Sequence, residues 1–109
     1  MNKNYRQGKV YVKDVLAGII KETESGYSFT YCEEYLLMPE AVSVSLTLKL
    51  QNEPYLGTQI FPFFDGIIPE GWLMESTMRI WKLPREDRFG LLLVACKDPV
   101  GRVSIEEIE

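Results

Sequence analysis

The apolar residues of this chain repeat with two different periods, and the change of period near the middle limits what the chain can fold into. Up to about residue 48, apolar and polar residues alternate, most strictly over 27–31 and 42–48. A period of two puts successive side chains on opposite faces of a strand, so these segments predict half-buried strands. From residue 69 the spacing becomes helical, which predicts a chain of strands followed by helices.

The N-terminal half predicts antiparallel strands joined by tight turns. Polar residues suited to turns, Lys13-Asp14 and 22–26, separate strand-like segments. The segment 32–37 fits neither period clearly and ends at Pro39. A long loop is expected over 51–59, which contains Pro54 and Gly57. The predicted strands are 9–12, 15–20, 27–31 and, with one face buried, 42–48.

The C-terminal half predicts helices and a last short strand. The aromatic-rich segment 61–68 predicts a short helix or turn, and 69–82 predicts a helix that begins at Pro69 and stops before Pro84. Asp87 is expected to cap a further helix that ends at Cys96, and 103–105 predicts a final strand. This order predicts one α+β domain over 1–109, with two or three helices packed on one side of a small antiparallel sheet.

The sequence contains no arrangement of residues that suggests an active site. It has no histidine, and its two cysteines, Cys32 and Cys96, are too far apart in sequence for a metal-binding pair. No glycine-rich phosphate loop is present, and the carboxylates fit solvated faces and helix caps. We therefore expect no catalytic residue, no metal site, no cofactor and no enzyme activity.

The net charge and the hydropathy of the chain limit which kinds of partner and which cell compartment are expected. The net charge of −4 argues against direct binding of nucleic acid, because that affinity depends on clustered lysine and arginine. No segment approaches the roughly 20 apolar residues of a membrane helix, and no signal-type apolar segment follows the polar N-terminus. A cytoplasmic protein with reduced thiols, away from the membrane, is expected.

Trp72 is the one large apolar residue that the helical spacing of 69–82 places among polar residues. Trp81 falls on the apolar stripe and is expected in the core, whereas Trp72 lies beside Glu75, Ser76, Arg79 and Lys82. An exposed tryptophan is a candidate anchor for a protein partner. Two positions of Trp72 remain open: exposed to solvent, or folded back over the 61–64 aromatic cluster. The aromatic cluster itself is more typical of a core than of an interface.

The chain resembles the N-terminal domain of HipA-family toxin kinases over about residues 9–105. The most specific part is the Phe63-Phe64 pair, followed by Asp65, two isoleucines, Pro69-Glu70-Gly71 and Trp72. The resemblance implies a small barrel-like sheet with helices. The matching segments are 10–12, 16–18, 27–31, 44–46, 61–71, 89–92 and 97–105.

In that family the domain precedes a serine/threonine kinase body that inhibits growth by phosphorylating a translation factor. The sequence shows no kinase body, as in the three-gene arrangement in which a small HipS-type protein is encoded apart from a HipT-type kinase. The resemblance implies an antitoxin that binds a HipA-like serine/threonine kinase of the HipT type, within a ternary complex that includes a HipB-like helix-turn-helix repressor.

The resemblance and the helical pattern together predict a partner-binding site. Trp72 is expected to be the anchor in the nucleotide or substrate cleft of the kinase. The supporting or flanking residues are Pro69, Glu70, Gly71, Phe63 and Phe64. A non-inhibitory scaffold that completes the kinase or bridges it to the repressor is the alternative, and a fragment of a longer kinase is a third possibility.

Overall fold

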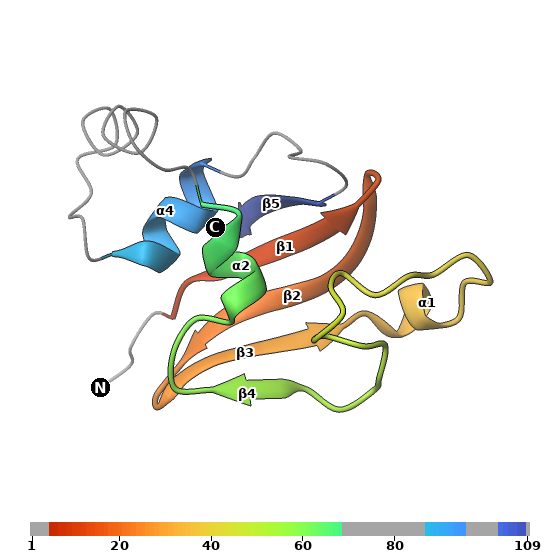
Figure 1. Ribbon diagram of the computed structural model, residues 1–109, viewed down its shortest axis with the longest axis horizontal. Coiled ribbons are helices and arrows are strands. Elements are labelled where there is room, and N and C mark those ends of the chain that lie inside the picture. The colour runs from red at the N-terminus through yellow and green to blue at the C-terminus, as the bar shows by residue number, and fades with distance from the viewer. Residues whose placement is uncertain (1–4, 69–86, 96–102, 109) are drawn as a thin grey trace.

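The fold is an antiparallel sheet with short helices on one face (Figure 1). The structure is a computed structural model, and it describes residues 5–68, 87–95 and 103–108. The strands lie in the order β4-β3-β2-β1-β5. They are β1 (Gln7–Val12), β2 (Val15–Thr23), β3 (Gly26–Tyr31), β4 (Tyr55–Gly57) and β5 (Val103–Ile108). The described helices are α1 (Glu33–Leu36), α2 (Pro62–Gly66) and α4 (Arg88–Ala95).

The first hairpin forms where the alternating pattern predicts it. Lys13 and Asp14 have φ values of 50° and 67°, which is the conformation that a two-residue hairpin turn requires at both positions. The register between β1 and β2 shifts after Val10, so that Ala17 is an extra, fully buried residue opposite the shift. The Ala17 carbonyl accepts a hydrogen bond of 2.8 Å from the Cys32 N–H, which ties this bulge to the end of β3.

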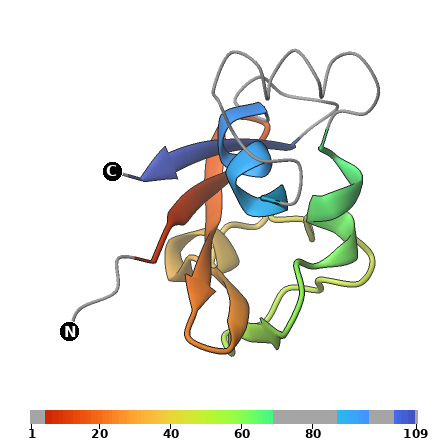
Figure 2. The ribbon, with the colours of Figure 1, turned by 90° about the vertical axis from the view of Figure 1, so that its left-hand side faces the viewer.

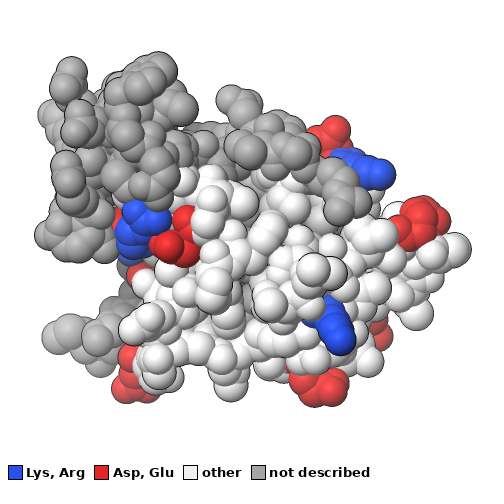
Figure 3. Space-filling model, viewed as in Figure 1, with Lys and Arg blue, Asp and Glu red and all other residues white. Residues whose placement is uncertain are grey.

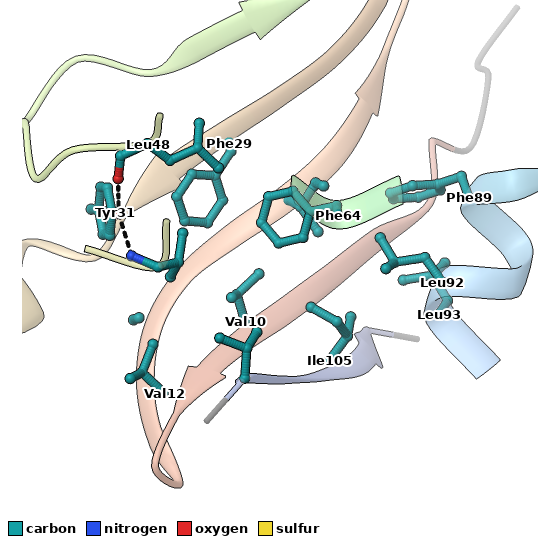
Figure 4. Packing of buried hydrophobic residues seen from close by; sticks show 14 of the residues in the cluster. Val10, Val12, Phe29, Tyr31, Leu48, Phe64, Phe89, Leu92, Leu93 and Ile105 are labelled. Carbon is teal, nitrogen blue, oxygen red and sulfur yellow. Dashed lines mark hydrogen bonds between the residues drawn. The ribbon is translucent and has the colours of Figure 1, made fainter. Parts of the chain in front are cut away.

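One face of the sheet is covered and holds the core. Figure 2 shows α2 and α4 on the same side of the strands. The alternate residues of the strands point into this layer and meet the apolar residues of both helices (Figure 4). The fully buried residues with the largest side chains are Phe29, Phe64, Phe89, Ile20, Leu91, Leu92, Leu93, Ile105 and Val10.

The sheet is open, which corrects the barrel-like arrangement that the resemblance implies. β4 and β5 lie at opposite edges, separated by three strands. Closure would require these two edges to hydrogen-bond to each other. β4 has only three residues, Tyr55–Gly57, and directly follows Pro54, so this edge offers a short row of backbone groups. The predicted α+β class, with helices on one side of a small antiparallel sheet, is confirmed.

Two segments differ from the prediction. Residues 42–48 do not form a strand; an isolated bridge between Ser45 and Leu48 is their only sheet-like pairing among the described residues. Tyrosine hydroxyls bind the backbone groups that a neighbouring strand would otherwise pair. The expected loop 51–59 instead contains β4, because its residues 55–57 pair with β3.

The helix predictions that fall on described residues are confirmed. α2 lies within the predicted 61–68 segment, with Pro62 in its first turn. Asp87 caps α4, since its Oδ1 accepts a hydrogen bond of 3.1 Å from the Gly90 N–H. The predicted helix 69–82, with Trp72 and Trp81, and Cys96 lie outside the described residues. No helix in the described part of the chain is long and apolar enough to cross a membrane.

Candidate protein-binding surface

The two phenylalanines predicted to support a partner site take different places in α2. Phe64 is fully buried, and its ring centroid lies 5.4 Å from that of Phe29 on β3. Phe63 is half-buried and packs edge-on against Phe64, with ring centroids 5.2 Å apart. Phe64 therefore packs α2 against the sheet, whereas part of the Phe63 side chain remains accessible to solvent. Phe64 can only support a partner site indirectly.

An ion pair joins α2 to α4. The Arg88 Nε donates to Asp65 Oδ1 at 2.8 Å, and the Arg88 Nη2 donates to the Asp65 carbonyl oxygen at 3.4 Å. Ile68, which follows α2, is also buried in the core. The path of the chain is therefore well anchored up to Ile68. The predicted site residues Pro69, Glu70, Gly71 and Trp72 come next in sequence and lie outside the described residues.

Arg6 is at the centre of a cluster of charged residues that joins β2 to the start of α4. Its guanidinium donates two hydrogen bonds of 2.9 Å to Glu22 on β2 and two of 2.8 Å to Asp87 at the start of α4. The guanidinium carbon also lies 5.5 Å from the centre of the Phe89 ring. Hydrogen bonds from Arg6 lower the pKa of both Glu22 and Asp87. These carboxylates are paired and ionised, which suits a structural role and not proton transfer.

The described residues provide little for chemistry. They contain no group of three or more side chains that could hold a metal ion. Cys32 is a free, half-buried thiol, and burial, with a smaller effect of Glu34, raises its pKa. A raised pKa lowers the fraction of thiolate and makes this cysteine a poor nucleophile.

Three tyrosines hold the segment 42–50, which we call the clamped loop. The Tyr31 hydroxyl donates to the Leu48 carbonyl oxygen and accepts from the Val44 N–H at 3.0 Å (Figure 4). The Tyr35 hydroxyl donates to the Val42 carbonyl oxygen at 2.8 Å and accepts from the Val42 N–H at 3.1 Å. The Tyr55 hydroxyl donates to the Lys49 carbonyl oxygen at 2.7 Å. These bonds come from β3, α1 and β4, so the loop is bound to three separate elements.

The clamped loop presents aliphatic side chains to solvent, and two of them, Leu46 and Leu50, line an open hollow. Leu46 is 92% exposed, Val42 is 39% exposed and Leu50 is 37% exposed. By contrast, Val44 and Leu48 point inward and belong to the core. The hollow has a volume of about 560 Å³. Its lining residues are Ser43, Val44, Ser45, Leu46, Lys49 and Leu50.

Sequence reasoning did not single out this surface. The alternating aliphatic residues from Val42 to Leu48 indicate a strand with one buried face, which would place Leu46 beside Val44 and Leu48 in the core. No local signal separates the exposed Leu46 from its buried neighbours. Which of these side chains is buried and which is exposed depends on the hydroxyl groups of Tyr31 and Tyr35. A tyrosine in a sequence does not show which backbone groups its hydroxyl will bind.

Comparison with solved structures identifies the class of fold. The chain superposes on the N-terminal domain of HipA toxin with a TM-score of 0.73 and 23% sequence identity, over 100% of this chain and 98% of that one. The two chains therefore share one fold, that of a small α+β domain. In sequence, the chain is 28% identical over 102 residues to an uncharacterised protein of Haemophilus influenzae, a match that covers 94% of this chain and 92% of that protein.

The family assignment rests on a family model. The model described as the HipA N-terminal domain matches residues 8–106, which is nearly the same span as the resemblance over 9–105. The chain belongs to the HipA N-terminal domain family, a family related to toxin–antitoxin systems.

Proposed function

We propose that this protein is an antitoxin that binds and inhibits a separately encoded HipA-like serine/threonine kinase of the HipT type. The observation that carries the proposal is the family match, which spans residues 8–106 and therefore almost all of the 109 residues. The similar solved domain is by its description a part of a toxin. A free copy of such a domain can occupy the position that the fused domain takes beside a kinase body.

The proposed inhibitory contact is the segment from Pro69 to Trp72. Trp72 would insert into the nucleotide or substrate cleft, with Glu70 and Gly71 beside it. A buried tryptophan anchor contributes about 2–4 kcal/mol to binding, which corresponds to a change in affinity of roughly 30-fold or more. Two residues of α2, the buried Phe64 and the half-buried Phe63, support the chain just before this segment.

The test is a phosphorylation assay with the partner kinase, in which the purified chain is titrated in. Wild type should inhibit the kinase, and Trp72→Ala should inhibit at least roughly 30-fold less well while keeping the wild-type melting temperature. A matched control is Leu56→Ala, which changes an exposed side chain on β4. Equal inhibition by wild type and a folded Trp72→Ala variant would remove Trp72 as the anchor.

A second result would change the proposed role. If the chain binds the kinase tightly and phosphorylation continues unchanged, the protein acts as a scaffold that completes the kinase or bridges it to a HipB-like repressor. The same titration, repeated with the repressor present and with operator binding as the readout, distinguishes these two roles. Absence of any binding to the kinase would contradict both.

A further inference from the structure

Two ion pairs bind the start of α4 to two different elements of the fold. Arg88, the first residue of α4, is bound to α2: its Nε donates to Asp65 Oδ1 at 2.8 Å, and its Nη2 donates to the Asp65 carbonyl oxygen at 3.4 Å. The preceding residue, Asp87, is bound through Arg6, whose guanidinium also binds Glu22 on β2. The chain that enters α4 is therefore fixed both to α2 and to the sheet.

The ion pair between Asp65 and Arg88 joins two points of the chain that are 23 residues apart. The Ile68 N–H donates to the same Asp65 carbonyl oxygen at 3.3 Å, so the guanidinium lies at the end of α2, a position that favours a cation. Ile68 itself is buried. The two residues that flank the segment 69–86, Ile68 and Asp87, are thus both fixed by this group of contacts.

Gly90 leaves the space in which the second ion pair lies. A Cβ at this position would overlap Asp87 Oδ2 and would lie 2.9 Å from Arg6 Nη1. The Gly90 N–H also donates to Asp87 Oδ1 at 3.1 Å. The ion pair therefore lies directly against the first turn of α4, and it sets the direction in which the chain enters this helix.

Apolar packing holds the two helices on the sheet, whereas the ion pairs add direction. Phe64 of α2 and Phe89 of α4 are each at most 1% exposed. The side chains of Arg88 and Asp65 are 29% and 43% exposed, and a pair with this much solvent contact contributes little to stability. In Figure 3, basic and acidic side chains adjoin on the surface where Figure 1 places α4 beside α2. Apolar contact is non-directional, but a guanidinium and a carboxylate bond only in a narrow range of orientations.

We propose that Asp65 and Arg88 are positioning residues for inhibition of the kinase. Their ion pair fixes the two ends between which the segment 69–86 runs, and so sets the position from which Trp72 reaches its partner. Four residues of chain span at most about 14 Å, so the place and direction of the chain at Ile68 limit where Trp72 can bind. Fixing both ends of a binding segment also reduces the entropy lost on binding. This proposal rests on the proposed function.

The test is a double-mutant cycle in the phosphorylation assay, with each variant titrated into the purified partner kinase. Asp65→Asn and Arg88→Gln each remove one charge of the pair, and each should raise the inhibition constant by roughly fivefold or more. The double variant should inhibit about as well as Arg88→Gln alone, because the pair is already broken in that variant. Asp14→Asn is the matched control: it makes the same substitution at an exposed turn residue and should inhibit within about twofold of wild type.

The melting temperature separates positioning from folding. Asp65→Asn should melt within about 4 °C of wild type, because the pair that it breaks is partly exposed. A much lower melting temperature, with inhibition lost only in proportion to the unfolded fraction, would show that the pair merely stabilises the fold and would overturn the proposal. Additive losses in the cycle would overturn it too, since Asp65 would then act independently of Arg88, for example by touching the kinase directly.

The outcomes also separate this proposal from the proposed function. If wild type inhibits the kinase and Trp72→Ala weakens inhibition, yet Asp65→Asn inhibits like wild type, the positioning role is wrong and the antitoxin function stands. If wild type does not bind the kinase, both are wrong.

Discussion

At the scale of single residues, the tyrosines have the most specific roles in this protein. Tyr31 is buried at the end of β3, and its hydroxyl serves both a donor and an acceptor of the clamped loop. It also packs edge-on against Phe29, with ring centroids 4.9 Å apart. One side chain thus contributes apolar area to the core and hydrogen bonds to a segment that pairs with no neighbouring strand among the described residues. Its ring and its hydroxyl can be tested separately.

We expect Tyr31→Phe to lower the free energy of unfolding by about 1–3 kcal/mol, because it leaves the buried Val44 N–H and Leu48 carbonyl without their hydroxyl partner. Tyr11→Phe is the control. Its hydroxyl makes an exposed hydrogen bond of 3.1 Å to Glu106, so its loss should change stability by less than about 0.5 kcal/mol. Urea unfolding measures both, and equal effects would contradict the clamp.

At the scale of elements, the hairpin between β2 and β3 depends on a close approach to β4. Gly26 has a φ of +157°, and a Cβ at this position would overlap the carbonyl oxygen of Gly57. Gly26 pairs with Thr23 across the hairpin, while Gly57 pairs with Tyr27 at the start of β3. The short edge strand β4 therefore reaches its place only because Gly26 has no side chain.

Gly26→Ala should destabilise the protein by more than about 2 kcal/mol, since the new methyl group must displace the backbone of β4 and adopt an unfavourable φ. Gly66→Ala in α2 is the matched control. A Cβ there meets nothing within 4 Å, so alanine should raise stability by about 0.5–1 kcal/mol through its better helix propensity. Thermal unfolding compares the pair, and a neutral Gly26→Ala variant would show that β4 moves freely.

At the scale of the whole molecule, Arg6 connects parts of the chain that are far apart in sequence. It binds Glu22, which is 16 residues away, and Asp87, which is 81 residues away. The same Asp87 caps α4 through the Gly90 N–H. One guanidinium therefore holds the first strand, the second strand and the helix in a common arrangement. This arrangement should respond to pH, because it depends on two ionised carboxylates.

The pH dependence of stability follows from the lowered pKa of Glu22 and Asp87, for which hydrogen bonds from Arg6 are the largest cause. A carboxyl group with a lower pKa in the folded state stabilises the protein above its unfolded pKa, about 4, and loses this contribution as the pH falls through the folded value. Wild type should therefore lose stability progressively as the pH falls below about 5.

The variant Arg6→Met tests this prediction. At neutral pH it should be less stable than wild type by about 1–2 kcal/mol, because the three side chains are partly exposed and their interaction is screened. The difference should shrink as the pH falls towards about 3, while Lys21→Met, an exposed control on β2, should follow the wild-type curve. Parallel curves for wild type and Arg6→Met would contradict the linkage.

Features that depend on near neighbours in the chain can be predicted from the amino-acid sequence alone. Alternating residues and the Lys13-Asp14 turn predict the first hairpin, and Asp87 predicts the start of α4, because turns and caps are made within a few residues. The order of periods predicts the α+β class. The HipA-type motif around Phe63 and Phe64 also lies in a single stretch of sequence, so it predicts the family.

Features that depend on distant partners are settled only when the chain folds. Residues 42–48 have the pattern of a strand, yet hydroxyl groups of Tyr31 and Tyr35 turn them into a loop that buries Val44 and exposes Leu46. Neither the pairing of β4 with β3 nor the Arg6 cluster has a local signal in the sequence. The physical reason is the same in each case. A hydrogen-bonding group shows its chemistry in the sequence, but only folding decides which distant group it meets.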